Sequence, residues 1–341
     1  MSKYDDVTAA LQREPKTWLV TGAAGFIGSH LVQTLLRLNQ RVVGVDNFAT
    51  GHRKNLDEAA GSDERFTFHE GDVSDVAFMD GVMPGIDIVL HQAALGSVPR
   101  SIKDPLTSHK ANVDGFVVML DAARRAGVKR VVYASSSSVY GDEPNLPKQE
   151  HRIGKPLSPY AATKAINEVY ADVFGKTYGL QTIGLRYFNV FGPRQDKAGA
   201  YAAVIPAWVG RLLGGEACTI NGDGDTSRDF CFVDNAVQAN ILAGVADDVA
   251  TQQVYNVACG DRTTLTTLFA LIRDGLADRA RSSDEARRLR DTHAAYGAFR
   301  DGDVRHSLAD ITRARQLLGY EPTHDVKAGL DTALSWYAAH V

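Results

Sequence analysis

The stretch TGAAGFIG at residues 21–28 decides the fold of this chain. It follows the apolar run WLV at residues 18–20 and precedes a segment of helical period at residues 26–38. Glycines at this spacing allow a tight turn, bring the backbone against a pyrophosphate, and let the helix pack close to the strand. The free N–H groups at the start of that helix favour a phosphate. The residues predicted to contact a dinucleotide here are Gly22, Gly25, Phe26 and Ile27.

Short apolar runs alternate with helix-length segments as far as residue 186, which is typical of βαβ units and a parallel sheet. The runs lie at residues 18–21, 41–45, 66–68, 86–90, 130–134 and 182–185, and the clearest helices at 111–126 and 160–178. After residue 190 the loops lengthen and the alternation stops. We therefore predict an α/β fold: a short extension at 1–15, a doubly wound Rossmann-type domain at 16–190, and a smaller mixed α/β lobe at 191–341, with some chain crossing back.

Composition excludes several classes of function. The 341 residues are 44% hydrophobic and carry a formal net charge of −4, which gives no basic surface for nucleic acid or for anionic membranes. No apolar run reaches the roughly 20 residues that span a bilayer. The first 15 residues lack the basic start and apolar centre of a signal peptide, so we expect a cytoplasmic protein. The three cysteines and ten histidines show no metal-ligand spacing, and no metal is predicted.

Asp46 selects between the two nicotinamide cofactors. It ends the second apolar run, 18 residues after Gly28, where a carboxylate can accept hydrogen bonds from both hydroxyls of an adenosine ribose. A 2′-phosphate would meet like charge there, so NAD is favoured over NADP. An aspartate that only caps the next turn is the alternative. Later strand ends add candidates for the same cofactor: Asn47, Asp72, Val73, Gln92, Ala93 and Ala94.

Tyr160 and Lys164 carry the predicted chemistry. A spacing of four puts both side chains on one face of a helix. A free tyrosine titrates near pH ~10, too high for a base at neutral pH, and a neighbouring ammonium would lower its pKa. The run SSSS at residues 135–138 ends the fifth strand, where a hydroxyl can donate to the substrate oxygen that the tyrosine deprotonates.

Motifs in order along nearly the whole chain resemble the extended short-chain dehydrogenase/reductase family. They are TGAAGFIGSHL at 21–31, DN at 46–47, GDV at 71–73, HQAA at 91–94, SSSSVYG at 135–141, SPYAATK at 158–164, RYFNVFGPRQ at 186–195, RDF at 228–230 and GDVRHSLADI at 302–311. The resemblance implies that Tyr160, Lys164 and Ser136 are catalytic. It also implies that Asn112 and Tyr187 contact the NAD.

The resemblance also implies a nucleotide-sugar substrate held mainly by the C-terminal lobe. Arg228 and Arg300 would flank a pyrophosphate, Asp303 would bind the uridine ribose, and Asn189 would contact the diphosphate or the sugar. Asn221 stands where many relatives have an aromatic residue, so base stacking there is expected to be weaker. The remaining predicted contacts are Gly96, Ser97, Ser136, Ser137, Ser138, Gln195, Ala203, Val204, Asn221 and Ser307.

Two positions refine the reaction implied by the resemblance. Relatives that dehydrate or decarboxylate carry an acidic residue just before VYG, and here that residue is Ser138. This leaves oxidation and reduction at sugar C4, which is epimerisation. Ser307 matches a position where galactose-only epimerases have a tyrosine, and a small residue makes room for an N-acetyl group. The implied activity is a UDP-N-acetylglucosamine 4-epimerase.

Three alternatives remain at this point. A UDP-glucose 4-epimerase, or an epimerase of UDP-glucuronate or a UDP-N-acetyl uronic acid, would use the same Tyr160 and Lys164. The alternative that is not an enzyme is an NAD-sensing scaffold, which has no chemical need for the tyrosine, the lysine and the serine together. Relatives pair two helices per subunit in a four-helix bundle, so we expect a homodimer built from residues 106–126 and 161–178.

Overall fold

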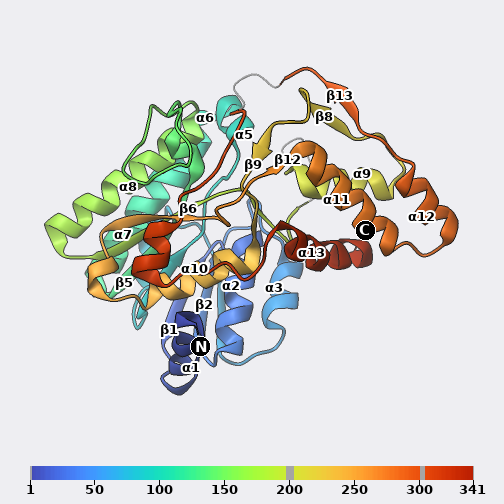
Figure 1. Cartoon of the computed structure of the whole chain (residues 1–341). Helices are drawn as coiled ribbons and strands as arrows, with labels where there is room; N and C mark the ends of the chain where they lie inside the picture. Colours follow the sequence, from blue (N-terminus) through green and yellow to red (C-terminus); the bar gives the residue numbers. More distant parts are fainter. Residues whose placement is uncertain (1, 197–202, 300–303, 341) are drawn as a thin grey trace.

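The computed structural model describes residues 2–196, 203–299 and 304–340, and its centre is a sheet of seven strands (Figure 1). The strand order is β11-β6-β5-β4-β1-β2-β3, and every pair is parallel. The strands are β1 (Thr17–Thr21), β2 (Arg41–Asp46), β3 (Phe66–Glu70), β4 (Ile88–His91), β5 (Arg130–Ser136), β6 (Gln181–Tyr187) and β11 (Gln253–Val257). The order reverses between β1 and β4, so ligands are expected at the carboxyl ends of these two strands.

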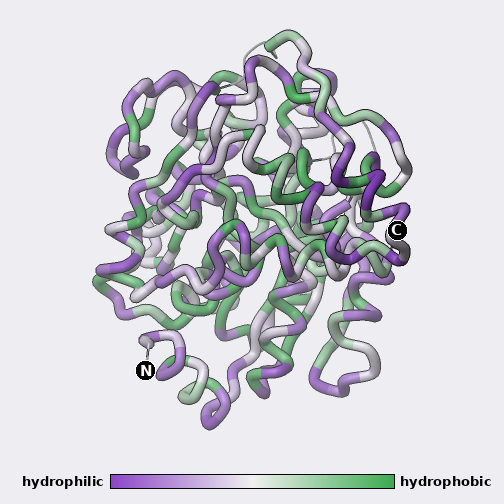
Figure 2. Tube along the Cα trace, turned by 45° about the vertical axis from the view of Figure 1, so that its right-hand side comes forward, coloured by the Kyte–Doolittle hydropathy of each residue, from purple (hydrophilic) through white to green (hydrophobic). Residues whose placement is uncertain are grey.

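Helices cover both faces of this sheet because the strands are apolar on both sides. In β1, Trp18 and Val20 belong to the core on one face, and Leu19 belongs to the core on the other. The helices of the first face are α2 (Phe26–Arg37), α3 (Arg53–Ala60) and α10 (Val233–Gly244), and those of the second are α4 (Val76–Val82), α7 (Gly115–Arg125) and α8 (Pro159–Tyr178). Hydrophobic stretches run through the interior in Figure 2, with hydrophilic ones on outer turns.

A second hydrophobic core lies among elements that follow residue 190. These elements lie together on the right of Figure 1: α9 (Val204–Leu213), β8 (Thr219–Asn221), α11 (Leu265–Asp278), α12 (Ser283–Arg290), β13 (Ala295–Gly297) and α13 (Val326–His340). The strand β11 and the helix α10 also follow residue 190, but they return to the central sheet. The chain after residue 190 thus contributes to the central sheet as well as to the second core, and the division into domains stays a prediction.

Short elements connect these layers. They are α1 (Lys3–Arg13), α5 (Val98–Lys103), α6 (Pro105–His109), the π-helix η1 (Lys110–Asp114), the 3₁₀ turns η2 (Ser137–Tyr140) and η3 (Asp248–Ala250), the π-helix η4 (Ala314–Leu318), β7 (Val190–Phe191), β9 (Ser227–Arg228), β10 (Cys231–Phe232) and β12 (Thr263–Thr264). The helix α1 contacts α10, and it occupies most of the predicted N-terminal extension.

The α/β class and the doubly wound parallel sheet are confirmed. The predicted helix at residues 160–178 is α8, which begins at Pro159 because the Ser158 hydroxyl accepts from the Ala161 N–H at 3.1 Å. The helix predicted at 111–126 differs at its start, because residues 110–114 form the π-helix η1 before α7 continues.

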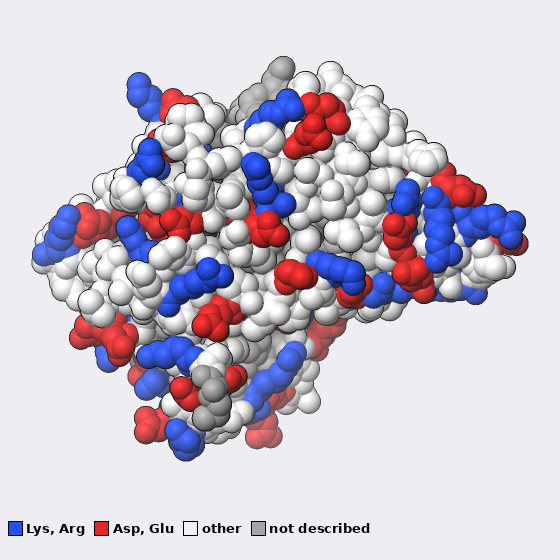
Figure 3. All heavy atoms as spheres, viewed as in Figure 1, with Lys and Arg blue, Asp and Glu red and all other residues white. Residues whose placement is uncertain are grey.

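Surface charge, helix length and possible metal ligands are the remaining features of the fold. Acidic and basic side chains are mixed over the face seen in Figure 3. Among the described residues, none of the helices combines the length and apolarity that a membrane span requires. Within those same residues, no three or more His, Cys, Asp or Glu side chains cluster as metal ligands would, and the three cysteines are free thiols.

Candidate active site

The connection from β1 into α2 has no room for a Cβ atom at two of its glycines, Gly22 and Gly28. Gly22 has a φ of +69°, and a Cβ there would lie 2.8 Å from the backbone nitrogen of Ala93. A Cβ on Gly28 would collide with the carbonyl oxygen of Gly22. The helix α2 starts at Phe26 after Gly25, and no side chain caps its first N–H groups. These N–H groups and the helix dipole therefore face the turn, as a pyrophosphate requires.

Asp46 ends β2 beside this turn. Its carboxylate accepts from the backbone nitrogens of Ala24 at 2.9 Å and Phe48 at 2.8 Å. Burial raises the pKa of Asp46, and these backbone hydrogen bonds oppose the rise. Each carboxylate oxygen keeps a further lone pair for a ribose hydroxyl. The neighbouring Asn47 donates its amide to Asp72 at 3.0 Å, so the ends of β2 and β3 are tied together at this edge.

The end of β4 supplies small side chains and a hydrogen-bonded triad. The amide of Gln92 lies between Asn240 of α10 at 3.0 Å and the hydroxyl of Tyr187 at 3.1 Å. Asn240 also donates to Tyr187 at 2.7 Å. Ala93 and Ala94 follow and are partly buried. Gln92 and Tyr187 are therefore hydrogen-bonded to each other and to Asn240, which the sequence analysis missed because nothing in its helix marks it. The contacts of Gln92 and Tyr187 with NAD stay predictions.

Two further predicted cofactor contacts are buried. Asn112 accepts from the backbone nitrogen of Leu95 at 2.7 Å and donates to Thr163 at 3.1 Å. It therefore joins the loop after β4 to α8, and its contact with the cofactor stays a prediction. Val73 packs against the position of Gly115. The glycine turn, the uncapped helix start and the strand-end acid together fit NAD.

The three predicted catalytic residues come from β5 and α8. Ser136 is the last residue of β5, and its side chain forms a hydrogen bond with Tyr160. Tyr160 lies in the first turn of α8, and its backbone nitrogen donates to the Ser101 hydroxyl at 3.0 Å. One turn later, the Lys164 Nζ donates to the carbonyl oxygen of Ala134 in β5 at 2.8 Å. The fold therefore brings all three residues to the same end of β5.

The electrostatics of these residues are set by burial. Burial raises the pKa of Tyr160, and the hydrogen bond with Ser136 opposes the rise. Lys164 is only 2% exposed, and burial lowers its pKa to about 8, while the negative charge of Glu168 opposes that fall. The lowering of the Tyr160 pKa that we expect from Lys164 must therefore overcome the effect of burial, and it stays a prediction.

Three of the serines predicted to contact the substrate, Ser97, Ser136 and Ser138, form hydrogen bonds within the protein. Ser136 accepts from the Ser138 hydroxyl at 2.9 Å, and Ser137 lies between them, partly exposed. Ser97 caps α5 by accepting from the Arg100 nitrogen at 3.2 Å. Gly96 has open space around the position of a Cβ. These residues lie on the loop after β4 and on the turn after β5, and their contact with the substrate stays a prediction.

The remaining described candidates lie on segments after β6. Asn189 donates to the Asp229 carbonyl at 3.1 Å, and Arg228 donates to the carbonyls of Ser227 at 2.9 Å and Arg305 at 3.2 Å. Ser307 donates its backbone N–H to the Ser227 carbonyl at 3.0 Å. Asn189, Arg228 and Ser307 are therefore joined through β9 and the residue that follows it.

Four other candidates complete the set. Gln195 donates to the Val190 carbonyl at 3.1 Å, and its buried oxygen has no hydrogen-bond partner within the described part of the chain. Ala203 and Val204 are at the start of α9. Asn221 ends β8, paired with Gly297 of β13. The predictions for Arg300 and Asp303 lie outside the described residues.

A buried ion pair next to the site was missed. Arg186 of β6 is 2% exposed, and its guanidinium contacts the Glu168 carboxylate at 2.7 Å. Both residues lie in or next to stretches that the sequence analysis predicted as a strand and a helix. A single charged residue in such a stretch does not reveal which residue it forms an ion pair with. Glu168 lies four residues after Lys164, and Arg186 is the first residue of the RYFN motif. These two positions were the only signal that the sequence offered.

Comparisons with known proteins agree with this geometry. A profile of the NAD dependent epimerase/dehydratase family matches residues 18–258. The UDP-glucose 4-epimerase of Mycolicibacterium smegmatis is 38% identical over 94% of this chain and 97% of its own length. The solved UDP-N-acetylglucosamine 4-epimerase of Methanobrevibacter ruminantium M1, in complex with UDP-N-acetylmuramic acid, is 38% identical with a TM-score of 0.88, covering 96% and 99%.

A third relative is a solved UDP-glucose 4-epimerase of Thermotoga maritima with UDP-glucose. It is 34% identical with a TM-score of 0.85, and the match covers 95% of this chain and 99% of that one. The family profile and these relatives agree with the strand–turn–helix at residues 17–37 and with the seven-stranded sheet around it. The chain therefore belongs to the NAD dependent epimerase/dehydratase family.

Proposed function

We propose that this NAD-dependent UDP-sugar 4-epimerase interconverts UDP-GlcNAc and UDP-GalNAc. The observation that carries the sugar assignment is Ser307, a small side chain on a segment hydrogen-bonded to β9 next to Arg228. Gly96, with open space around its Cβ position, supports the same assignment from the loop after β4. Small residues at both positions support a site that accommodates an acetamido group at sugar C2.

The base in the proposed reaction is Tyr160. Its phenolate takes the proton from the sugar 4-hydroxyl, and the Ser136 hydroxyl, which already contacts Tyr160, donates to the same sugar oxygen. The Lys164 ammonium stabilises the phenolate by its charge. When bound, NAD would supply the hydride chemistry at sugar C4, and the glycine turn and Asp46 would hold it. No net oxidation occurs.

Ser138 supports epimerisation over elimination. An acid at this position would lie one hydrogen bond from Ser136, where it could protonate or deprotonate a neighbouring carbon substituent. Here the Ser138 side chain is a hydroxyl that donates to Ser136 at 2.9 Å. A hydroxyl has no charge to offer at neutral pH, so the site is left with acid–base chemistry at the 4-oxygen alone.

The rest of the substrate is assigned to the C-terminal segments. Arg228 would bind the diphosphate, since guanidinium pairs with phosphate oxygens through two parallel hydrogen bonds. Asn189, Gln195, Ala203, Val204 and Asn221 would surround the diphosphate and uracil. We also propose a homodimer: Leu106 of α6 is 82% exposed and Val169 of α8 is 63% exposed, and burying such side chains against a second copy is favourable.

The test is nuclear magnetic resonance of the sugar nucleotides after incubation with purified enzyme. Separate samples receive UDP-GlcNAc, UDP-glucose and UDP-glucuronate. We expect UDP-GlcNAc to reach equilibrium with UDP-GalNAc at the highest rate of the three. Conversion of UDP-glucose or UDP-glucuronate alone would reject the N-acetyl assignment, and no conversion of any sugar would favour the NAD-sensing scaffold.

A further inference from the structure

Glu168 lies one helical turn after Lys164 on α8, in a position that its hydrogen bonds fix from both sides. Its Oε1 accepts from the Ser135 hydroxyl at 2.5 Å and from the Arg186 Nε at 2.9 Å. Its Oε2 accepts from the Arg186 Nη2 at 2.7 Å. The side chains of Glu168 and Arg186 are 12% and 2% exposed, respectively, so their ion pair is largely removed from water. Charge-assisted hydrogen bonds in this setting are short and directional.

The residues that Glu168 contacts are next to the proposed catalytic groups. Ser135 sits between Ala134, whose carbonyl holds the Lys164 Nζ at 2.8 Å, and Ser136, whose side chain contacts Tyr160. The end of β5 is therefore attached to α8 at three consecutive residues. Glu168 makes the middle attachment, and a shift of its carboxylate would move both neighbouring contacts.

We propose that Glu168 is a positioning residue for epimerisation: held by Arg186, it fixes the end of β5 through Ser135 and keeps the buried Lys164 in its charged form. The inference rests on the proposed roles of Tyr160 and Lys164. No contact between Glu168 and the substrate is needed for it.

The charge on Lys164 depends on its surroundings because the side chain is buried. Burial lowers the Lys164 pKa to about 8, and the Glu168 carboxylate opposes that fall. Removing the carboxylate leaves burial unopposed, so the pKa must drop further. A drop of about one unit would reduce the charged fraction at pH 8 from roughly a half to roughly a tenth. The phenolate form of Tyr160 would lose its stabilising charge over the same pH range.

Other charged or titratable side chains face Glu168 from the elements around it. Arg186 comes from β6 and Tyr133 from β5, and the Glu168 charge raises the Tyr133 pKa after the larger effect of burial. Arg186 in turn stacks on the Tyr140 ring at 4.8 Å and donates to the Glu150 carbonyl at 3.0 Å. Because Arg186 keeps these contacts, Glu168 can be changed without freeing the whole guanidinium.

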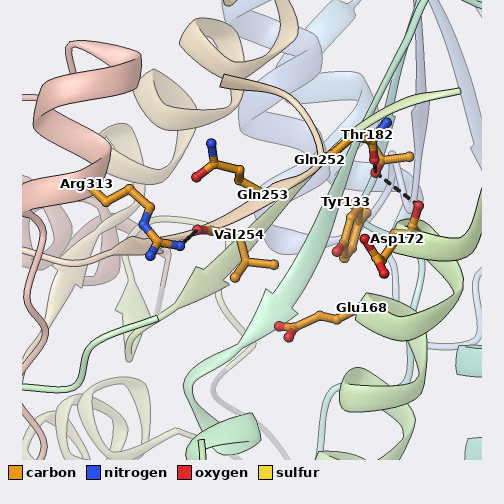
Figure 4. A pocket seen from close by; sticks show the side chains of 9 residues that line it. Tyr133, Glu168, Asp172, Thr182, Gln252, Gln253, Val254 and Arg313 are labelled. Carbon is orange, nitrogen blue, oxygen red and sulfur yellow. Dashed lines mark hydrogen bonds between the residues drawn. The ribbon is translucent and has the colours of Figure 1, made fainter. Parts of the chain in front are cut away.

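Asp172, which lies one turn after Glu168 on α8, provides a matched control. Glu168 and Asp172 both line the pocket in Figure 4, together with Tyr133, Gln252 and Arg313. Asp172 is 47% exposed and pairs with Lys176 at the surface. Neutralising it removes the same charge from the same pocket, one turn further from Lys164, in a place where solvent screens it.

The experiment compares Glu168→Gln with Asp172→Asn in the NAD-containing enzyme. For Glu168→Gln we expect kcat at pH 8 to fall about tenfold with KM for the UDP-sugar near that of the parent. Since a lower Lys164 pKa means that the ammonium loses its proton at lower pH, the alkaline limb of kcat should move to lower pH by about one unit. Asp172→Asn should match the parent in kcat and in its pH profile.

A direct titration separates electrostatics from stability. The ¹³Cε signal of Lys164 in lysine-labelled protein, assigned with Lys164→Met, should titrate at lower pH in Glu168→Gln and unchanged in Asp172→Asn. Because Glu168→Gln leaves Arg186 buried without its partner, it is destabilising. The double variant Glu168→Gln/Arg186→Gln removes both charges, and we expect a smaller shift in the same direction. Ser135→Ala keeps the ion pair and tests the attachment of β5 alone, with a lower kcat and an unchanged Lys164 pKa.

The outcomes separate this inference from the proposed function. If Tyr160→Phe keeps parent activity, the catalytic assignment fails. If Tyr160→Phe is inactive, but Glu168→Gln and the double variant keep the parent alkaline limb and the parent Lys164 titration, then Glu168 has only a structural role and the inference is overturned. A parent-like kcat in Ser135→Ala would overturn the geometric part in the same way.

Discussion

Replacing Ser307 with tyrosine should separate the two kinds of sugar. If Ser307 faces the C2 substituent, a phenol ring at this position would overlap an acetamido group and spare a hydroxyl. The segment cannot easily retreat, because three neighbouring hydrogen bonds of its backbone hold it: Ser307 N–H to the Ser227 carbonyl at 3.0 Å, Lys148 N–H to the Leu308 carbonyl at 2.7 Å, and Ala309 N–H to the Asp229 carboxylate at 3.2 Å. The conflict must therefore fall on the substrate or on the new ring.

The expected fall in kcat/KM for UDP-GlcNAc can be estimated from these contacts. Overfilling a packed site costs about 1–3 kcal/mol. Breaking these three hydrogen bonds would cost at least about 0.5–1.5 kcal/mol each, so moving the segment brings no relief. A loss of about 1–3 kcal/mol corresponds to roughly a 5- to 150-fold fall in kcat/KM for UDP-GlcNAc. UDP-glucose turnover should stay the same or improve.

The assay is kcat/KM for both sugars in Ser307→Tyr, in the parent and in a matched control. Thr312→Tyr adds the same ring to the same stretch of chain at an exposed position, and it should leave both sugars unaffected. The ratio of the two kcat/KM values decides the question. If that ratio is unchanged in Ser307→Tyr, Ser307 does not select the sugar, and the N-acetyl preference needs another explanation.

Three further predictions follow from the site. Tyr160→Phe should lower kcat by about 10²–10⁴-fold and leave UDP binding intact, because only the proton acceptor is lost; calorimetry and turnover measure the two effects. Purified enzyme should carry NAD that none of the buffers supplied, released on denaturation, and a requirement for stoichiometric NADPH would contradict this. Light scattering at micromolar concentration should give a dimer, and a monomer would reject the proposed pairing through residues 106–126 and 161–178.

The parts of the site that could be predicted from sequence are encoded locally. The glycine turn follows β1 and Asp46 ends β2, so their places in the chain put them at the carboxyl edge of the sheet. The spacing of Tyr160 and Lys164 predicts only that both side chains share one face of α8. Ser136 needed the resemblance, because four consecutive serines give no reason to choose one. In the structure the choice is physical, since Ser136 ends β5 and contacts Tyr160.

The parts that could not be predicted depend on pairs far apart in the chain. Asn240 meets Gln92 across 148 residues, and the Asn256 amide joins Lys148 to Asp310. Asn112 shows the converse, because a residue assigned to the cofactor by resemblance forms its hydrogen bonds with Leu95 and Thr163. A polar residue has many possible partners, and only the folded chain decides between them.

Asp229 explains why the diphosphate and sugar candidates lie side by side. It follows Arg228 directly, and its carboxylate accepts from the backbone nitrogens of Cys259 at 2.9 Å, Gly260 at 3.1 Å and Ala309 at 3.2 Å. Burial raises the Asp229 pKa to about 7, with the three N–H donors opposing the rise. A buried acid is costly, and an apolar residue at this position could accept none of these three hydrogen bonds. The bond to Ala309 holds the segment of Ser307 against the strand of Arg228, and thereby sets the distance between the groups proposed to bind the diphosphate and the sugar.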